Sequence, residues 1–382
     1  MVTGGGTGGH TSPAVAVIEE LRRRDPGLDL RWVGRRGGIE ERICSRLDIP
    51  FRAVSVAGWP RRGRIRQLAV GGILAVGLVQ SWLLLRRFQP QIVFGVGGYV
   101  SLPLGYAAAR MGIPVVLHEQ NRLLGMANRV LAPRAAQILL SYPDTVGSYP
   151  KDRAAVVGNP VRPAFTMPPS IAEARAAMDL DAGIPVVLVV GGSQGARTLN
   201  TAVAEALSQA SEGEFQLIWM TGPNDAPAAR IRADQAPIRV QVHPFIDDMV
   251  TACAAADLIV ARSGASTTAE IAVLGKPSVL VPYPHAAENH QEENARVLEE
   301  AGAAEVLLDG DCTGERLLAR VRAILSDPDR RVRMGKAALA FGRPEAADRI
   351  AETILSLVFE APRNAAALEA DEADQTDETD GT

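Results

Sequence analysis

The chain alternates between short apolar runs and longer stretches rich in Ala, Leu and Arg. The apolar runs are rich in β-branched residues and end at glycine-rich or polar loops, at 92–94, 115–117, 186–190, 258–260 and 279–281. The stretches between them have the composition of helices, at 102–111, 199–210, 267–274 and 290–301. This alternation is typical of parallel sheets covered by helices on both faces, so we expect an α/β fold.

Two glycine-rich loops and one proline-containing segment divide this pattern. A glycine-rich loop precedes a helix at Gly4–His10 and again at Gly191–Arg197. The segment 157–163 between them contains two prolines and a glycine, which favours a linker or hinge. We therefore expect an N-terminal domain over 1–160, a C-terminal domain over 161–344 and a closing helix over 345–360.

Both ends of the chain depart from the pattern. Only Met1, Val2 and Thr3 precede the first glycine-rich loop, where a buried central strand is expected. We therefore expect the first strand to be truncated and the N-terminal half to be poorly stable. Residues 361–382 are acidic and contain no aromatic side chain. Such a segment buries too little apolar surface to become ordered, so a disordered tail is predicted.

Charge is distributed unevenly between the expected domains. Residues 1–160 carry 21 Lys and Arg against 10 Asp and Glu, whereas residues 161–360 carry 18 against 27. The basic half favours an anionic partner. At 47% hydrophobic and 22% charged, the composition excludes collagen-like and disordered classes. The three cysteines are far apart, which indicates neither a disulfide framework nor a zinc site, and without a signal peptide a cytosolic location is the default expectation.

The glycine-rich loops suggest phosphate binding. Glycines let the backbone approach a ligand closely, and the N–H groups at the start of the next helix favour an anion. Ser193 adds a hydroxyl donor to the second loop. The alternative is a tight strand–helix turn that binds nothing. Neither loop has the P-loop form or the G-x-G-x-x-G form, which disfavours nucleotide hydrolysis and nicotinamide binding and leaves a diphosphate as the preferred ligand.

Three further polar positions are candidates for chemistry. His10 ends the first glycine-rich loop and could take a proton from an attacking hydroxyl, or simply cap the helix. Glu270, expected near a helix start, could accept two hydrogen bonds from a ribose diol, or stabilise the helix dipole. Glu119 lies in a polar His-Glu-Gln-Asn run after a strand, where open α/β sheets place ligand contacts. No metal site is expected, because the histidines lack ligand spacing: His10, His118, His243, His285 and His290.

The segment 68–85 is almost wholly apolar and is flanked by arginines. Its length suits a transmembrane helix, but it lies inside one predicted α/β domain. A buried helix and a helix lying on the membrane surface are the alternatives, and we prefer the latter because arginines attract anionic lipid. The residues expected to contact the membrane are Arg61, Arg62, Arg64, Arg66, Leu68, Ile73, Leu74, Leu78, Trp82, Leu85, Arg86 and Arg87.

An ordered set of short motifs resembles the MurG family of peptidoglycan N-acetylglucosaminyltransferases. The resemblance runs from residue 2 to about residue 358. Its motifs are Gly-Gly-Gly-Thr-Gly-Gly-His at 4–10, Gly-Gly-Tyr-Val-Ser at 97–101, His-Glu-Gln-Asn at 118–121, Gly-Asn-Pro-Val-Arg at 158–162, Gly-Gly-Ser-Gln-Gly-Ala-Arg at 191–197, Phe-Ile-Asp-Asp-Met at 245–249 and Arg-Ser-Gly-Ala at 262–265.

The resemblance implies a GT-B fold, in which two Rossmann-like domains have parallel sheets facing a central cleft. It implies inverting transfer of N-acetylglucosamine from UDP-GlcNAc to the muramyl 4-hydroxyl of lipid I, which forms lipid II for cell wall synthesis. It further implies a peripheral enzyme on the cytoplasmic side of the cell membrane, in contact with anionic lipid. No cofactor, tightly bound metal or nucleic acid partner is expected.

Site residues follow from the matched motifs. The resemblance implies that His10 is the catalytic base or an acceptor-diphosphate contact, with His118 and Glu119 as rivals for proton handling. It implies that Ile246 contacts uracil through its backbone, that Glu270 contacts the ribose, and that Ser193 contacts the diphosphate. The remaining residues expected to bind UDP-GlcNAc are Thr7, Gly8, Gly9, Asn121, Arg162, Ala265, Ser266, Thr267, Thr268, Ala269 and Gln291.

Two other functions fit part of the pattern. A UDP-GlcNAc 2-epimerase of the same architecture would explain a nucleotide-sugar site, but neither the arginine-flanked apolar segment nor the His-Glu-Gln-Asn run. A non-catalytic membrane scaffold would leave the polar loops of both domains unexplained. His290 also departs from the family pattern, since some relatives have glutamine there.

Overall fold

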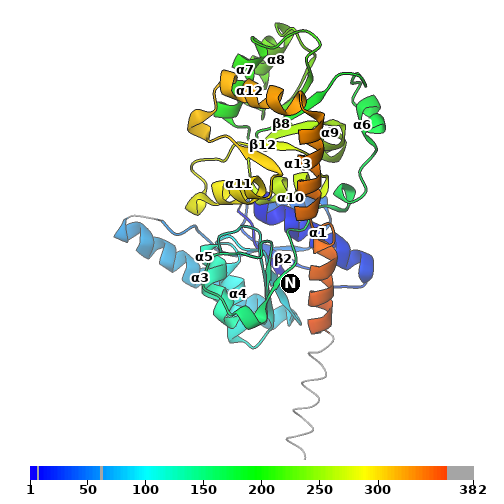
Figure 1. The fold of residues 1–382 in the computed structure, drawn as a ribbon. Helices are drawn as coiled ribbons and strands as arrows, with labels where there is room; N and C mark the ends of the chain where they lie inside the picture. The colour runs from blue at the N-terminus through cyan, green and yellow to red at the C-terminus, as the bar shows by residue number, and fades with distance from the viewer. Residues whose placement is uncertain (7, 61–62, 359–382) are drawn as a thin grey trace, which may run out of the picture. The chain divides into compact units, whose positions relative to one another are not determined.

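The computed structural model describes residues 1–6, 8–60 and 63–358 (Figure 1). The chain divides into two compact units, each an α/β unit built on one parallel sheet. Of the described residues, the first unit contains those of 1–120 and 124–158 together with 345–358, and the second contains 121–123 and 159–344. The change of unit after Gly158 lies inside the predicted linker. Residues 121–123, which the sequence placed in the N-terminal domain, group with the second unit.

The first unit has a seven-stranded parallel sheet with the order β3-β2-β1-β4-β5-β6-β7. Its strands are β1 (Val2–Thr3), β2 (Trp32–Gly34), β3 (Phe51–Ala53), β4 (Val93–Gly95), β5 (Val115–Glu119), β6 (Gln137–Leu140) and β7 (Ala154–Val156). Its longer helices are α1 (Gly8–Arg24), α2 (Ile39–Arg46), α3 (Arg64–Phe88), α4 (Leu102–Arg110), α5 (Met126–Leu131) and a closing helix over 346–358. The core lies on both faces of the sheet, with α1 and the closing helix on one face and α3, α4 and α5 on the other.

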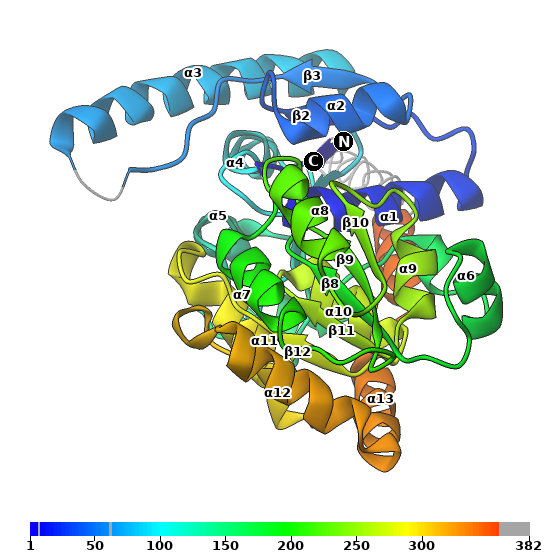
Figure 2. The ribbon, with the colours of Figure 1, turned by 90° about the horizontal axis from the view of Figure 1, so that it is seen from above.

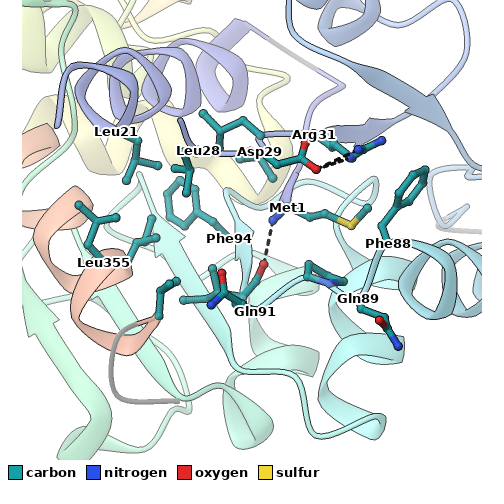
Figure 3. Close-up of a pocket in the computed structure, with 16 residues that line it drawn as sticks. Met1, Leu21, Leu28, Asp29, Arg31, Phe88, Gln89, Gln91, Phe94 and Leu355 are labelled. Carbon is teal, nitrogen blue, oxygen red and sulfur yellow. Dashed lines mark hydrogen bonds and ion pairs between the residues drawn. The ribbon is translucent and has the colours of Figure 1, made fainter. Parts of the chain in front are cut away.

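Strand β1, the element expected to be truncated, is present and two residues long. Val2 and Thr3 pair with β2 on one side and with β4 on the other, so this short strand occupies the centre of the sheet. The amino group of Met1 donates to the carbonyl of Ile92 at 2.8 Å. Burial lowers the pKa of this amino group to about 5. Met1 lines a pocket with a volume of about 240 Å³. Figure 3 shows the apolar side chains of Leu21, Phe94 and Leu355 among those that line it.

The second unit has a six-stranded parallel sheet with the order β10-β9-β8-β11-β12-β13. Its strands are β8 (Val186–Val190), β9 (Gln216–Met220), β10 (Val240–His243), β11 (Leu258–Ala261), β12 (Ser278–Leu280) and β13 (Ala304–Val306). Its helices are α6 (Ile171–Ala177), α7 (Arg197–Leu207), α8 (Ala226–Asp234), α9 (Met249–Ala255), α10 (Ala265–Val273), α11 (His290–Glu300), α12 (Gly314–Leu325) and α13 (Pro328–Phe341).

Strand β8 shows why this sheet needs helices on both faces. All five of its residues are buried. Val186, Leu188 and Val190 join the core under α6, α9, α10 and α11. Val187 and Val189 join the core under α7, α8 and α12. These three helices are labelled in Figure 2. Because each buried valine or leucine contributes about 1.5–3 kcal/mol, the two layers of helices stabilise the strand from both sides. The strands and helices predicted from the apolar runs are confirmed to within two or three residues at their ends.

Helix α3 packs with one face only. Gly77, Ser81 and Leu85, spaced four residues apart, are buried. A Cβ at Gly77 would lie 2.0 Å from the carbonyl oxygen of Ser55, so glycine is required for this close approach. Gln80 accepts a hydrogen bond from the backbone N–H of Ser55 at 2.7 Å. This face holds α3 against the first unit, with Leu85 in the core that α4 also lines.

Candidate active site

The first cluster of candidate residues lies at the carboxyl ends of β1, β4 and β5, which are neighbours in the first sheet. The chain order reverses between β1 and β4, and open α/β sheets bind ligands beside such a reversal. The loop after β1 leads into α1, which carries His10 in its first turn. The loop after β4 contributes Gly97 and Gly98, and Gln120 follows β5 directly.

Glycine is needed where these loops meet. Gly5 and Gly98 have φ values of +150° and +74°, which side chains rarely adopt. A Cβ at Gly98 would lie 2.5 Å from the carbonyl oxygen of Gly5 and 3.3 Å from Cδ2 of His10. The two glycine-rich loops therefore pack directly against each other and against the edge of the imidazole.

His10 is partly exposed, and one of its ring nitrogens is engaged. Nδ1 lies 2.9 Å from Oε1 of Gln120. Within the described ranges of the chain, Nε2 of His10 has no hydrogen-bond partner. A histidine held at one nitrogen and open at the other is suited to accept a proton. The position predicted for the base therefore has the geometry of one.

His118 is placed differently from what proton transfer requires. Its side chain is fully buried, and Nε2 lies 3.0 Å from the carbonyl oxygen of Gly158. Nδ1 lies 3.0 Å from Nε2 of Gln120. Burial lowers the pKa of His118 to about 4. Both ring nitrogens are thus engaged inside the protein, so this geometry does not support the predicted role of His118 in handling a proton of the substrate.

Glu119 is likewise an internal group. Its side chain is buried, and Oε2 accepts hydrogen bonds from the backbone N–H of Gly125 at 2.9 Å and from Nδ2 of Asn128 at 2.8 Å. These bonds fix the loop between β5 and α5. The geometry therefore does not support the prediction that Glu119 competes with His10 as a base, because its carboxylate already accepts hydrogen bonds from Gly125 and Asn128.

The second cluster lies in the second unit, again where the strand order reverses, between β8 and β11. The loop after β8 exposes Ser193 and leads into α7, and the loop after β11 leads into α10. The residues that precede these helices, Ala196 and Gly264, provide no side-chain cap. The first N–H groups of both helices are therefore not satisfied by capping, which suits them to an anion. Ser266 and Thr267 lie partly exposed in the first turn of α10.

Glu270 is the sixth residue of α10, not a first-turn residue as the sequence suggested. In the part of the chain that the structure describes, its carboxylate has no hydrogen-bond or ion-pair partner. Burial raises the pKa of Glu270 to about 7, and the positive charge of Arg162 opposes part of this shift. The guanidinium of Arg162 lies over the ring of Phe165, at 5.2 Å from its centroid. The structure thus brings together two residues that the sequence assigned to the nucleotide.

Several other predicted contacts offer only their backbone. Ile246, Ala265 and Thr268 are buried, and Ala269 packs on the core. The hydroxyl of Thr268 donates to the carbonyl oxygens of Gly264 and Ala265 at 3.3 Å and 3.0 Å. The hydroxyl of Thr268 is therefore satisfied by the backbone at the start of α10, and the predicted contact of Thr268 with the donor is left to its backbone.

Asn121 and Gln291 both lie at helix α11: Gln291 is its second residue, and Asn121 contacts it. Oδ1 of Asn121 accepts a hydrogen bond from Nδ2 of Asn294 at 3.1 Å. Gln291 accepts from the backbone N–H of Tyr283 at 3.0 Å. Arg122 forms an ion pair with Glu293 at 3.1 Å. Asn294 was not anticipated, although the sequence offered a signal in its polar position one turn after Gln291.

The remaining predicted ligand contacts are backbone positions or lie outside the described residues. Gly8 begins α1 and Gly9 follows it. Thr7 lies outside the described residues. In the described ranges, 1–6, 8–60 and 63–358, no group of three or more His, Cys, Asp and Glu side chains could hold a metal ion.

Helix α3 is the one helix among the described residues that is long and apolar enough to cross a membrane, by length and composition. Only 17% of its most apolar 18-residue window is buried. The exposed large side chains are Ile65, Leu68, Ile73, Val76, Val79, Trp82 and Leu83, and we call them the apolar face of α3. Arg64, Arg66, Arg86 and Arg87 are exposed at its ends.

This arrangement corrects part of the predicted membrane contact. Leu85 is fully buried in the core, so the expectation that it meets lipid is wrong. Leu74 and Leu78 are half-buried. The predicted set omitted four members of the apolar face: Ile65, Val76, Val79 and Leu83. Arg61 and Arg62 lie outside the described residues.

Both units match known protein families. Residues 1–140 match the glycosyltransferase family 28 N-terminal domain, and residues 186–350 match the corresponding C-terminal domain. The protein of Desulfitobacterium hafniense named UDP-N-acetylglucosamine--N-acetylmuramyl-(pentapeptide) pyrophosphoryl-undecaprenol N-acetylglucosamine transferase is 38% identical over 369 residues, which cover 94% of this chain and 99% of that protein. The protein of the same name from Desulforudis audaxviator is 40% identical over 371 residues, covering 95% and 99%.

Solved structures agree in fold. The crystal structure of Acinetobacter baumannii MurG has a TM-score of 0.77 at 30% identity and covers 93% of this chain and 99% of that one. A UDP-GlcNAc 2-epimerase from Neisseria meningitidis bound to UDP-GlcNAc has a TM-score of 0.63 at 14% identity, covering 91% and 97%. The epimerase resemblance is one of architecture alone.

Proposed function

The chain belongs to the MurG family of N-acetylglucosaminyltransferases, within glycosyltransferase family 28, and from this membership we propose its reaction and the roles of its residues. The enzyme transfers N-acetylglucosamine from UDP-GlcNAc to the muramyl 4-hydroxyl of lipid I and so forms lipid II. The observation that carries this proposal is the identity of 35–40% to the family's transferases along 94–95% of the chain. The fold is the GT-B fold.

His10 is the proposed catalytic base. Its free Nε2 takes the proton of the acceptor hydroxyl as the oxygen attacks the anomeric carbon of the donor sugar. The bond from that carbon to UDP breaks with its electron pair on the diphosphate oxygen, so that the configuration at the carbon inverts. The support is geometric: among the described residues, both ring nitrogens of His118 and the carboxylate of Glu119 have partners, whereas Nε2 of His10 has none.

The second unit is proposed to hold the nucleotide. Glu270 accepts two hydrogen bonds from the ribose diol, because its carboxylate lacks a partner in the described structure and is desolvated. Ser193 and the first N–H groups of α7 and α10 bind the diphosphate, and Ser266 and Thr267 border it. Fixed N–H donors stabilise the charge that develops on the departing diphosphate. Arg162 adds a positive charge near Glu270.

Asn121 and Gln291 are proposed to bind the sugar. Asn294 holds the Asn121 side chain in place, and the loop between β12 and α11 holds Gln291. Among the described residues, the contact of Gln291 uses its amide oxygen and leaves its NH₂ group for a ligand. Amide groups fixed in this manner discriminate among sugar hydroxyl and acetamido groups, because a wrong substituent leaves a polar group unpaired.

The apolar face of α3 is proposed to lie on the cytoplasmic surface of the cell membrane. A transmembrane arrangement is disfavoured, since the opposite face of α3 is packed in the core of its own unit. Arg35 and Arg36 line a groove of about 410 Å³ together with Ile73 and Gln80 of α3. Basic groups beside an exposed apolar helix suit a surface of anionic lipid.

Product analysis tests the proposed reaction. The protein is incubated with labelled UDP-GlcNAc, with and without a lipid I analogue, and sugar-containing products are separated. We expect a lipid-linked disaccharide and UDP in equal amounts, and only when the acceptor is present. Formation of the manno epimer of the donor without acceptor would instead establish the epimerase, and a folded protein without turnover would overturn both.

A further inference from the structure

Gln120 lies between two histidines at the carboxyl end of β5. It is not among the site residues predicted from the sequence. Its amide oxygen faces His10 at 2.9 Å, and its amide nitrogen faces Nδ1 of His118 at 3.0 Å. The inference drawn from this arrangement rests on the proposed role of His10 as the base, but its first test does not depend on activity.

The orientation of the Gln120 amide is determined by backbone carbonyls. Nε2 lies 2.9 Å from the carbonyl oxygen of Val96 and 3.2 Å from that of His118. Carbonyl oxygens only accept hydrogen bonds, so the atom that faces two of them must be the NH₂ group. The reversed amide would set three oxygens against one another in a buried site. The amide oxygen therefore points toward His10.

The tautomer of His118 follows from its own surroundings. Its Nε2 faces the carbonyl oxygen of Gly158 at 3.0 Å, so Nε2 carries the proton and donates. The hydroxyl of Ser141 donates to the carbonyl of Glu119 at 2.8 Å and presents only its oxygen to the same Nε2. Because the pKa of this buried imidazole is about 4, His118 is neutral at physiological pH, and its Nδ1 accepts from Gln120.

We propose that Gln120 is the positioning residue that sets His10 in the Nδ1–H tautomer. The amide oxygen can only accept, so Nδ1 of His10 must donate to it, and the lone pair of the neutral ring is then on Nε2. The same amide accordingly holds the two histidines in opposite tautomers: His10 protonated on Nδ1 and His118 on Nε2. Gly97 and Gly98 lie beside the ring, since a Cβ at Gly97 would be 3.6 Å from its Nδ1 and a Cβ at Gly98 would be 3.3 Å from its Cδ2.

This role matters to the transfer step because only one nitrogen of His10 is open. In the Nδ1–H tautomer, Nε2 takes the proton from the attacking hydroxyl of lipid I as the new C–O bond forms and the bond to UDP breaks. The imidazolium that results donates from Nδ1 to the Gln120 oxygen, which stabilises the charge, and Nε2 then loses its proton to solvent. In the other tautomer Nε2–H cannot accept a proton, and the step fails. A wrong tautomer of the catalytic histidine in the Ser-His-Asp triad lowers kcat by about 10⁴.

The tautomers can be observed directly by long-range ¹H–¹⁵N correlation spectroscopy of the full chain labelled at its five histidines. Comparison with His10→Gln identifies the His10 ring. We expect a protonated Nδ1 and an unprotonated Nε2 in His10, and one other neutral ring with the opposite pattern. A His10 ring protonated on Nε2 in the unliganded protein overturns the inference.

Two variants extend the test to turnover. Gln120→Met removes both hydrogen-bonding groups of the amide and keeps a side chain of similar length. Ser141→Ala is the control, because it removes a neighbouring hydroxyl that does not touch His10. We expect Gln120→Met to abolish the single-tautomer pattern of His10 and to lower kcat by about 10²-fold, with KM for UDP-GlcNAc changed by less than about two-fold. Ser141→Ala keeps the His10 pattern and kcat.

The outcomes separate the inference from the proposed function. If Gln120→Met retains the wild-type His10 spectrum, Gln120 does not set the tautomer. If the spectra behave as expected but His10→Ala turns over at the wild-type rate, the proposed base is wrong and Gln120 does not act in catalysis. Should Gln120→Met prove unfolded by its thermal transition, Gln120→Glu replaces it. Whether this acid is neutral or ionised, the oxygen that faces His10 accepts from Nδ1, so Nδ1 of His10 must stay protonated, and an unprotonated Nδ1 overturns the inference.

Discussion

Glu270 carries a folding penalty that its function explains. A carboxylate that is largely desolvated and has no hydrogen-bond partner among the described residues is unfavourable when charged, which is why the pKa of Glu270 rises from 4.5 to about 7. The ribose diol proposed as its ligand supplies the missing donors. Charged Glu270 therefore lowers the stability of the free protein, and the proposed ribose contact offsets this in the complex. Such a combination is typical of binding sites.

The first prediction concerns stability and pH. Folding favours protonated Glu270, so the penalty is absent below about pH 4.5, grows between pH 4.5 and 7, and is fully present above pH 7. We expect Glu270→Gln to raise the free energy of unfolding at pH 8 by about 2–3 kcal/mol and to leave it unchanged at pH 4.5. Denaturant titration measures this. The exposed Glu212→Gln serves as the control, and an equal gain at both pH values would contradict the account.

The second prediction concerns the donor. Only charged Glu270 can accept two hydrogen bonds from a diol, so lowering the pH below about 7 removes the binding form. We expect the Kd of UDP-GlcNAc to rise about ten-fold for each unit of pH below 7. Glu270→Gln should bind weakly at every pH and lose this dependence. Calorimetry with UDP-GlcNAc, whose diphosphate diester does not titrate in this range, measures it, and an unchanged pH profile in Glu270→Gln would remove the ribose assignment.

At the scale of the element, helix α3 shows how one apolar sequence serves two environments. Its buried stripe of Gly77, Ser81 and Leu85 attaches the helix to its unit, and its apolar face remains uncovered. Hydrophobicity alone does not distinguish the two faces, because both are apolar. The distinction comes from tertiary packing, in particular from the close approach of Ser55 to Gly77.

The third prediction tests the membrane contact of α3. Ile65 and Leu68 are 85% and 77% exposed, and placing glutamate at both positions removes apolar area and adds negative charge. We expect Ile65→Glu/Leu68→Glu to weaken sedimentation with anionic vesicles by about two orders of magnitude. The control is Ile231→Glu/Leu339→Glu, which adds the same charge at exposed apolar positions of the second unit. Equal loss of binding in both variants would rule out α3 as the membrane contact.

The fourth prediction separates packing from lipid contact within α3. Leu85 is fully buried, so Leu85→Ala should lower the free energy of unfolding by about 2–5 kcal/mol. Vesicle binding by the folded variant should equal that of the wild type. A loss of vesicle affinity without a loss of stability would show that Leu85 faces lipid after all.

At the scale of the whole molecule, the alternation of apolar runs and helical stretches was enough to predict two parallel-sheet units. Runs such as 186–190 are buried on both faces in a parallel sheet and therefore leave an unambiguous signal in the sequence. The reversals of strand order between β1 and β4 and between β8 and β11 then explain why both glycine-rich loops border candidate sites.

The candidate site was predictable only in part, for a physical reason. Motif spacing located His10 and Glu270, but the roles of His118 and Glu119 depend on hydrogen bonds to Gly158 and Asn128, which are distant along the chain or on another element. The amide of Gln120 is oriented by the backbone carbonyl of Val96, in the loop after β4, and no sequence motif indicates this contact. Composition likewise located the basic half of the molecule, yet not which face of α3 is exposed.

The proposed mechanism divides the roles between two residues, with His10 as the proposed base and Glu270 as the proposed nucleotide contact. The most direct test is the rate of lipid-linked disaccharide formation by His10→Ala at saturating UDP-GlcNAc and lipid I analogue. We predict a fall of about 10²–10⁴-fold, with the Kd of UDP-GlcNAc unchanged. Turnover by His10→Ala at the wild-type rate would contradict the account.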